Sequence, residues 1–157
     1  MKKLIIAEKP SLARNIASAL NVRVNKEGYM ENEKYIVSWA FGHLFELRDV
    51  DGYVGEKRKW SEVRLPFFPE KFEFDLKNDS GIKKQYKVLK NLINSKEVDE
   101  IVNAGDADRE GQIIVDIIIN AIKTDKKIKR LWLPEQTEET IRKAINNLED
   151  NFKYRNL

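Results

Sequence analysis

The sequence contains no cysteine and only one histidine among its 157 residues. The absence of cysteine excludes disulfide bonds and every metal site that depends on thiolate ligands, such as structural zinc and iron–sulfur centres. A single histidine argues against a histidine-rich zinc site as well. Any bound metal must therefore be held mainly by carboxylates, which are the ligands of hard ions such as magnesium and manganese.

Long apolar runs are also lacking. No stretch approaches the roughly 18 apolar residues of a membrane span. The N-terminal apolar stretch ends at Glu8, which is too short for a signal peptide. We therefore expect a cytoplasmic protein with no membrane partner. The 29 Lys and Arg residues barely exceed the 26 Asp and Glu residues, so net charge alone does not predict a nucleic-acid partner.

The spacing of apolar residues predicts strands that alternate with helices. Strands are expected in KKLIIAE, DEIVNAGD and KIKRLWLP, and as a hairpin in GYMENEKYIVSWA. Helices are expected in PSLARNIASAL, KKQYKVLKNLINSK and REGQIIVDIIINAI, and in a last segment that Thr137 would cap and that would run to Leu148. This alternation is typical of an α/β domain whose mostly parallel sheet carries helices on both faces.

An insertion over residues 24–80 interrupts this pattern. It begins with the expected hairpin, and from residue 48 onward it shows no clear period. Six aromatic residues lie between Tyr53 and Phe74, and aromatic residues at such density usually pack. We interpret the region as an ordered, irregular insertion within one domain that spans residues 1–157.

Acidic residues gather after two of the predicted strands. Glu8 ends the first strand, and NAGDADREGQ at residues 103–112 places Asp106, Asp108 and Glu110 between another strand and a helix. Ligands of open α/β sheets bind outside the carboxyl ends of the strands, so these acids converge if the two strands are neighbours. The helix N-terminus would offset part of their repulsion, and a divalent cation the remainder.

Two other interpretations apply to the same stretch. It would be a solvated loop if its aspartates only cap the helix, which is the common role of an isolated D-x-D. An EF-hand calcium loop fails because its twelfth position is Ile117, where a bidentate glutamate is needed. The third acid, the glycine that follows it and the distant Glu8 favour a metal site over a simple cap.

The motifs AEKPSLA, FGHLFEL and NAGDADREGQ resemble the Toprim domain of type IA DNA topoisomerases, most closely the bacterial topoisomerase III branch. Further matching segments follow in the order found in that family: RKW and then LP, KKQYKVLK, and RLW with its capped helix. The resemblance therefore covers essentially the whole chain. Ala107, where this branch often has proline, and Pro134-Glu135 depart from the pattern. The resemblance implies a Toprim, Rossmann-like fold.

The same resemblance implies magnesium-dependent cleavage and religation of single-stranded DNA, with manganese as a possible substitute for magnesium. It implies that Glu8 is the general acid and the religation base, and that Lys9 stabilises charge on the scissile phosphate. Asp106 and Asp108 would hold the metal, with Glu8 as a further ligand. Glu110 is a weaker candidate ligand, because a glutamate in the first turn of a helix can also serve only as a cap. Crowding by the two aspartates would raise the pKa of Glu8.

Candidate DNA contacts have alternatives. Trp60, beside the basic Arg58, suits base stacking or core packing. Arg109 suits a phosphate contact or an ion pair with the acids. His43 suits a phosphate contact or a hydrogen-bonded position in the core or a turn. Lys84 lies where a helix would begin, which is electrostatically poor and hints at an anionic partner.

In this family the tyrosine nucleophile lies beyond residue 157, and none of the five tyrosines here matches its motif. We therefore expect the metal-binding and acid/base part of a longer topoisomerase, with downstream domains of the same parent chain as partners and with no DNA relaxation by this part alone. The alternatives are a stand-alone Toprim nuclease or primase-like phosphodiester enzyme and a non-catalytic nucleic-acid module.

Overall fold

The computed structural model describes residues 1–41, 45–47, 74–76 and 80–154. Its strands are β1 (Lys2–Ala7), β2 (Val24–Lys26), β3 (Tyr29–Glu31), β4 (Tyr35–Trp39), β5 (Phe45–Leu47), β6 (Phe74–Leu76), β7 (Val98–Ala104), β8 (Lys127–Arg130) and β9 (Glu149–Asp150). Its helices are α1 (Pro10–Ala19), α2 (Ser80–Ile93), α3 (Arg109–Ile122), α4 (Glu138–Ile145) and the short 3-10 helix η3 (Asn151–Tyr154).

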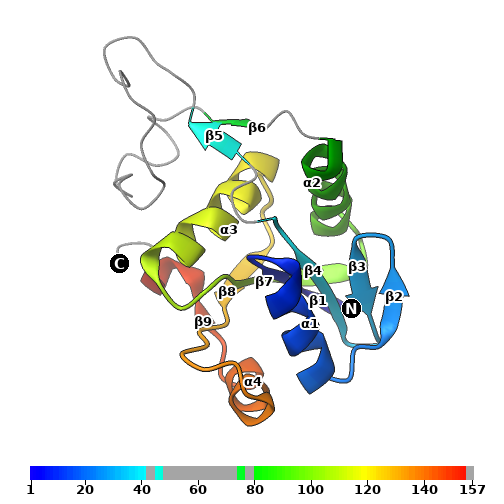
Figure 1. Ribbon diagram of the computed structural model, residues 1–157, viewed down its shortest axis with the longest axis vertical. Helices are drawn as coiled ribbons and strands as arrows, with labels where there is room; N and C mark the ends of the chain where they lie inside the picture. Colours follow the sequence, from blue (N-terminus) through cyan, green and yellow to red (C-terminus); the bar gives the residue numbers. More distant parts are fainter. Residues whose placement is uncertain (42–44, 48–73, 77–79, 155–157) are drawn as a thin grey trace.

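The main sheet has its strands in the order β2-β3-β4-β1-β7-β8-β9, and β5 and β6 form a separate antiparallel pair (Figure 1). The four central strands β4, β1, β7 and β8 are parallel. The strands β2 and β3 at one edge of the sheet, and β9 at the other, pair in antiparallel fashion. Leu4 to Ala7 of β1 are fully buried, as expected for a strand with parallel neighbours and helices on both faces. The predicted α/β fold is confirmed.

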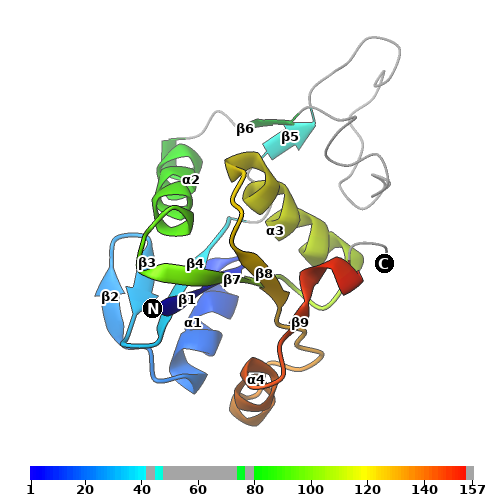
Figure 2. The same ribbon diagram turned by 180° about the vertical axis from the view of Figure 1, so that it is seen from behind.

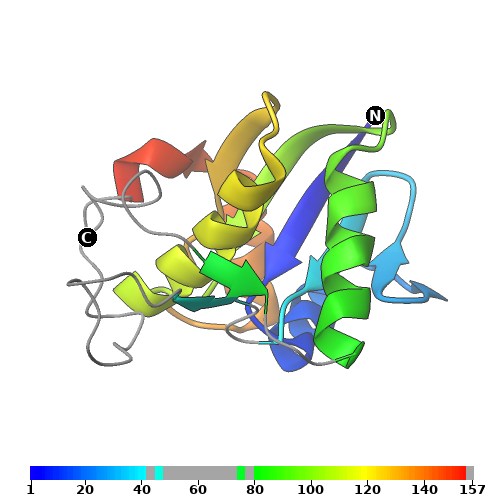
Figure 3. The same ribbon diagram turned by 90° about the horizontal axis from the view of Figure 1, so that it is seen from above.

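Helices cover both faces of the sheet because successive strand side chains point to opposite sides. Leu4, Ile6 and Ile101 belong to the core beneath α2 and α3, while Ile5 and Val37 belong to the core beneath α1 and α4. Figures 1 and 2 show α2 and α3 above the sheet and α1 and α4 below it. Figure 3 shows α2 and α3 together on the nearer face.

Local signals explain where the helices begin. Pro10 opens α1, where its missing N–H is not needed. The Thr137 side chain accepts the Thr140 N–H at 3.2 Å and caps α4, as predicted. Residues Gly111 to Ile119 of α3, which include its isoleucine run, are all buried. No helix in the ranges given above is long and apolar enough to cross a bilayer.

Some elements differ from the sequence-based expectation. The strands β2, β5 and β6 are absent from that expectation, because each is only three residues long and offers no period to detect. The strand β8 ends at Arg130, so that Leu131 and Trp132 lie beyond it. The helix α4 ends at Ile145 and not at Leu148, and β9 and η3 follow. The rest of the irregular insertion, residues 48–73 and 77–79, lies outside the described residues.

Two glycines let the loop between β7 and α3 fold back closely. A Cβ atom on Gly105 would lie 2.2 Å from the carbonyl oxygen of Gly111. A Cβ atom on Gly111 would lie 2.4 Å from the carbonyl oxygen of Asp106. Both obstructing atoms are backbone atoms, which cannot rotate away as a side chain can. The glycines therefore hold the first turn of α3 against the loop that carries Asp106.

Replacing Gly111 with alanine should lower the free energy of unfolding by about 2 kcal/mol, because the added methyl group pushes the loop away from α3. At an unobstructed helical position the same change raises stability by about 1 kcal/mol, so the sign of the effect reports the contact. Urea denaturation followed by circular dichroism measures it. Ser18→Ala, at an exposed position of α1, is the control; a Gly111→Ala protein as stable as the wild type would contradict the close packing.

Candidate metal and acid/base site

Parallel pairing of β1 and β7 brings the two acidic regions together. Ala7 at the end of β1 is in register with Ala104 at the end of β7. Glu8 directly follows the first strand, and Asp106 follows the second after Gly105. The sequence-based prediction required these two strands to be neighbours, and the structure confirms that they are.

The side chains of Glu8 and Asp106 meet at this edge of the sheet. Their carboxyl groups lie close enough that a hydrogen bond with Asp106 is one of the causes that raise the pKa of Glu8. One oxygen of each, Oε2 of Glu8 and Oδ1 of Asp106, is buried and has no hydrogen-bond partner. The Lys9 ammonium lies 4.0 Å from Oδ2 of Asp106 and is exposed. Two carboxyl groups in this arrangement need a proton or a cation between them, because unpartnered buried charge is strongly unfavourable.

The environment of Glu8 makes it an unusually weak acid. Burial, then the hydrogen bond with Asp106 and the negative charge of Asp106, raise the pKa of Glu8 to about 8, while the positive charge of Lys9 opposes the shift. Asp108 contributes least to the rise. The predicted direction is confirmed, but its main cause is loss of hydration and not the repulsion that the sequence suggested.

Asp108 points to the start of α3. Its side chain accepts the Gly111 N–H at 2.6 Å, and its own N–H donates to the Asp106 carbonyl oxygen at 2.7 Å. This is an N-cap interaction, which a carboxylate makes especially well because its charge opposes the positive end of the helix. The capping alternative therefore applies to Asp108, and its role as a metal ligand stays a prediction.

The remaining acids of the loop are less enclosed. Glu110 is exposed in the first turn of α3, and Arg109 is half-buried at its first position. Within the part of the chain that the structure describes, no three acidic or histidine side chains come together as a ready set of metal ligands. The predicted ligands thus divide into the adjoining pair of buried Glu8 and half-buried Asp106, and the two exposed residues Asp108 and Glu110 at the start of α3.

Only some of the residues predicted to contact DNA belong to the part of the chain that the structure describes. Lys84 is exposed on α2, where it forms an ion pair with Glu27. This pair gives the unusual charge near the start of α2 a partner within the protein. His43, Arg58 and Trp60 lie outside the described residues.

Arg130 contacts the acidic loop and is missed by reasoning from sequence. Nη1 donates to the carbonyl oxygens of Asn103, Gly105 and Leu131 at 3.0, 2.8 and 3.2 Å. Nη2 donates to the carbonyl oxygen of Asp106 at 2.8 Å. The one available signal is a basic residue at the end of a predicted strand, within the RLW motif.

A buried polar cluster supports the same loop. Oδ1 of Asn103 accepts the Gly105 N–H at 3.0 Å, and Nδ2 of Asn103 donates to Asp116 at 3.1 Å. Gln112 and Asn151 also donate to the Asp116 carboxylate, at 2.7 and 2.6 Å. These bonds join the end of β7 to α3 and η3, so the base of the loop has a fixed position.

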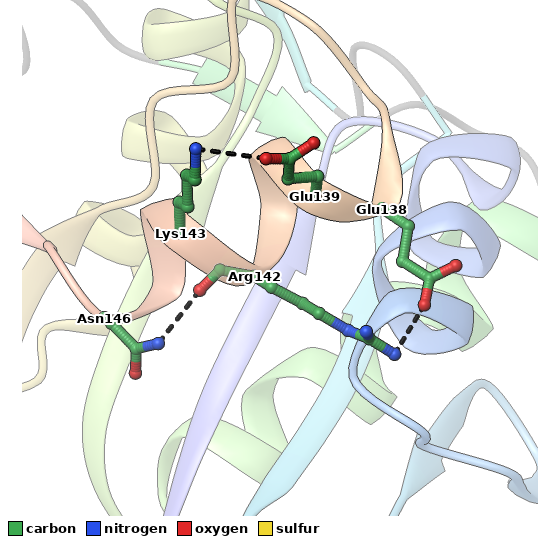
Figure 4. Close-up of a pocket in the computed structure, with 5 residues that line it drawn as sticks. All are labelled: Glu138, Glu139, Arg142, Lys143 and Asn146. Carbon is green, nitrogen blue, oxygen red and sulfur yellow. Dashed lines mark hydrogen bonds and ion pairs between the residues drawn. The ribbon is translucent and has the colours of Figure 1, made fainter.

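A hollow on α4 offers no comparable chemistry. Figure 4 shows that Glu138, Glu139, Arg142, Lys143 and Asn146 line it. The ion pairs Arg142–Glu138 and Lys143–Glu139 are both exposed and follow helical i,i+4 spacing, and such pairs contribute little. Arg142 also donates to the Ala19 carbonyl oxygen at 2.9 Å, which joins α4 to α1. The hollow therefore reads as an ordinary helix surface.

The fold and the site define a class of protein: an α/β domain that presents paired carboxyl groups at adjoining ends of two parallel strands. The Toprim domain family matches residues 3–136, and the chain belongs to this family. The family predicted from the motifs is confirmed.

The chain is more particularly similar to bacterial DNA topoisomerase 3. It is 38% identical to the protein of Staphylococcus haemolyticus over 100% of this chain and 22% of that protein. It is 40% identical to the protein of Bacillus cereus over 99% of this chain and 21% of that protein. The chain thus spans about a fifth of the length of these relatives.

A solved structure shares the fold. The structure of full-length topoisomerase I from Thermotoga maritima matches with a TM-score of 0.56 at 24% identity. The match covers 97% of this chain and 22% of that one.

Glu8→Gln should change how stability depends on pH. The pKa of Glu8 rises from its ordinary 4.5 to about 8 on folding, so the folded state binds the proton more tightly. That stabilisation is complete below pH 4.5 and is lost as pH rises through about 8. Across this range the wild type should lose up to about 5 kcal/mol of stability relative to Glu8→Gln.

Urea denaturation of both proteins in metal-free buffer, at pH values on either side of this range, measures the difference. Asp125→Asn, which removes an exposed carboxylate from another part of the chain, is the matched control and should follow the wild type. Identical pH dependence of the wild type and Glu8→Gln would show that Glu8 is not a perturbed acid.

Proposed function

We propose that this chain is the metal-binding and acid/base domain of a type IA, topoisomerase III-like DNA topoisomerase. The parent protein would cleave and reseal single-stranded DNA in a magnesium-dependent reaction. The contact between the carboxyl groups of Glu8 and Asp106 in a Toprim domain is the observation that supports this most directly. The similarity to proteins named DNA topoisomerase 3 supports the choice of reaction and substrate.

The residues at the site fit a divalent cation. Oε2 of Glu8 and Oδ1 of Asp106 are buried carboxylate oxygens without a hydrogen-bond partner, and Mg²⁺ and Mn²⁺ prefer oxygen ligands. Asp106 and Asp108 would hold the ion, with Glu8 and Glu110 as further ligands. When bound, the ion would neutralise the crowded carboxylates and stabilise negative charge on a phosphate.

Glu8 would act as the general acid for the leaving 3′-oxygen and as the base for religation. A carboxyl group whose pKa is about 8 is protonated at neutral pH, which is the form a proton donor needs. Lys9 is exposed next to Asp106, and its ammonium would stabilise charge on the scissile phosphate. The candidate DNA contacts are Trp60, Arg109, His43, Arg58 and Lys84.

The remaining parts of the reaction would come from the parent chain. Downstream domains would supply the tyrosine nucleophile and most of the groove for single-stranded DNA, and the enzyme would act on DNA in the cytoplasm. This domain alone would not relax DNA. A reading frame that continues well beyond Leu157 to such a tyrosine would agree with the proposal. A stop codon directly after Leu157 would favour a stand-alone Toprim nuclease instead.

Titration calorimetry with Mg²⁺ tests the metal site. The wild type should bind the ion, and Asp106→Asn should weaken binding about tenfold or more, because it removes a negative ligand. Asp125→Asn, which removes a carboxylate from an exposed site elsewhere, should bind like the wild type. A wild-type protein that binds no divalent cation would contradict the proposal.

Asp108→Ser separates the two roles of Asp108. Serine keeps a good N-cap side chain for α3 and removes the charge. If Asp108 is also a ligand, Mg²⁺ affinity should fall about tenfold while the free energy of unfolding changes by less than about 1 kcal/mol. Unchanged Mg²⁺ affinity would limit Asp108 to capping the helix.

A further inference from the structure

The last residue of β8 is an arginine whose guanidinium forms several hydrogen bonds with another segment. Arg130 is 1% exposed, and it is in register with Asn103 of β7. Its guanidinium donates to the carbonyl oxygens of Asn103, Gly105 and Asp106 at distances between 2.8 and 3.0 Å. These acceptors all belong to the stretch that leads from β7 to the proposed metal ligand Asp106.

The loop needs such a donor because it leaves the sheet at this point. The parallel pairing of β7 with β8 ends at Asn103 and Arg130. The Asn103 carbonyl oxygen still accepts the Leu131 N–H at 3.0 Å, and the Asp106 carbonyl oxygen accepts the Asp108 N–H at 2.7 Å. The Gly105 carbonyl oxygen accepts its hydrogen bond from Arg130. Buried carbonyl groups without donors are costly. A guanidinium offers five donors in a fixed plane, and hydrogen bonds from a charged donor are stronger than neutral ones. Arg130 therefore supplies the donor for Gly105 and adds a second, charged hydrogen bond to the carbonyl oxygens of Asn103 and Asp106.

Trp132 helps to fix the guanidinium itself. The Arg130 Cζ atom lies 4.9 Å from the centre of the Trp132 ring, a cation–π contact. The Trp132 ring limits the directions in which the guanidinium can move, while the N–H groups at the edge of the guanidinium donate to the loop. The RLW motif thus places a donor and its restraint two residues apart.

We propose that Arg130 is a positioning residue, which fixes the loop of residues 103–106 so that the Asp106 carboxylate stays beside Glu8 in a metal-binding arrangement. The inference rests on the metal site proposed above. Arg130 acts through the backbone that carries Asp106. Lysine cannot replace it, because one ammonium on a flexible stem cannot bond three separated carbonyl groups in a fixed plane.

Lys126 provides a matched control at the other end of β8. Its ammonium donates to the carbonyl oxygens of Ile93 and Ser95 at 2.7 and 2.6 Å. Like Arg130, it is a cation that holds backbone carbonyl groups, but it holds the end of α2 and not the acidic loop. Lys126→Met should lower stability without changing the loop.

The experiment compares Arg130→Lys, Arg130→Gln and Lys126→Met with the wild type in the whole chain. Mg²⁺ affinity is measured by titration calorimetry, and amide hydrogen exchange is measured by NMR without metal. Both Arg130 variants should weaken Mg²⁺ binding about tenfold or more, as loss of a residue that orients a ligand typically does. Both should also speed exchange at residues 105–108 more than in α1, and Lys126→Met should do neither.

A folded Arg130→Lys protein with wild-type Mg²⁺ affinity and wild-type exchange at residues 105–108 would overturn the inference. If Arg130→Gln does not fold, Arg130→Lys carries the test because it keeps the buried charge. If the wild type itself binds no Mg²⁺, the proposed function fails. Amide hydrogen exchange at residues 105–108 then decides whether Arg130 positions the loop. Faster exchange in the Arg130 variants supports the positioning role, and unchanged exchange overturns it.

Discussion

Two carboxyl groups meet in a poorly hydrated place where neighbouring parallel strands end, and the surrounding structure keeps them there. Ala7 of β1 and Ala104 of β7 are paired in register, so the backbone segments that carry Glu8 and Asp106 leave the sheet side by side. Burial of Glu8, at 9% exposure, removes the water that would otherwise solvate its charge. The pair must therefore share a proton or bind a cation.

The loop that carries Asp106 is held from several directions. Gly105 and Gly111 permit backbone contact between the loop and α3, and Asp108 caps that helix. Arg130 bonds to the loop carbonyl groups from the adjacent strand. The buried isoleucine run of α3 fixes the helix on the sheet. The buried face of α3, the Asp108 cap and the Arg130 guanidinium thus all hold the same short loop at the edge of the sheet.

The sequence was sufficient for the parts that depend on strand order and local signals. Strand ends followed by acids predicted that Glu8 and Asp106 meet, because the carboxyl ends of parallel strands share one edge. The capping of α4 by Thr137 could also be predicted, since a cap needs only the residues next to it. The raised pKa of Glu8 was predicted in direction but not in cause, because burial depends on the packed fold.

Features that depend on distant contacts could not be predicted. The pairing of Lys84 with Glu27 joins α2 to the turn between β2 and β3, and no local pattern reveals it. The contacts of Arg130 could not be predicted either, because its acceptors lie more than twenty residues earlier in the chain. For Asp108 the sequence allowed both a cap and a ligand, and only the direction of its side chain shows the cap.

Anomalous X-ray diffraction from crystals grown with Mn²⁺ tests the central claim most directly, because it locates the ion independently of any activity. We expect an anomalous peak in contact with the carboxylates of Glu8 and Asp106, where two buried oxygens have no hydrogen-bond partner. Crystals that contain Mn²⁺ but show no peak at these two residues, or a peak only elsewhere on the chain, would contradict it.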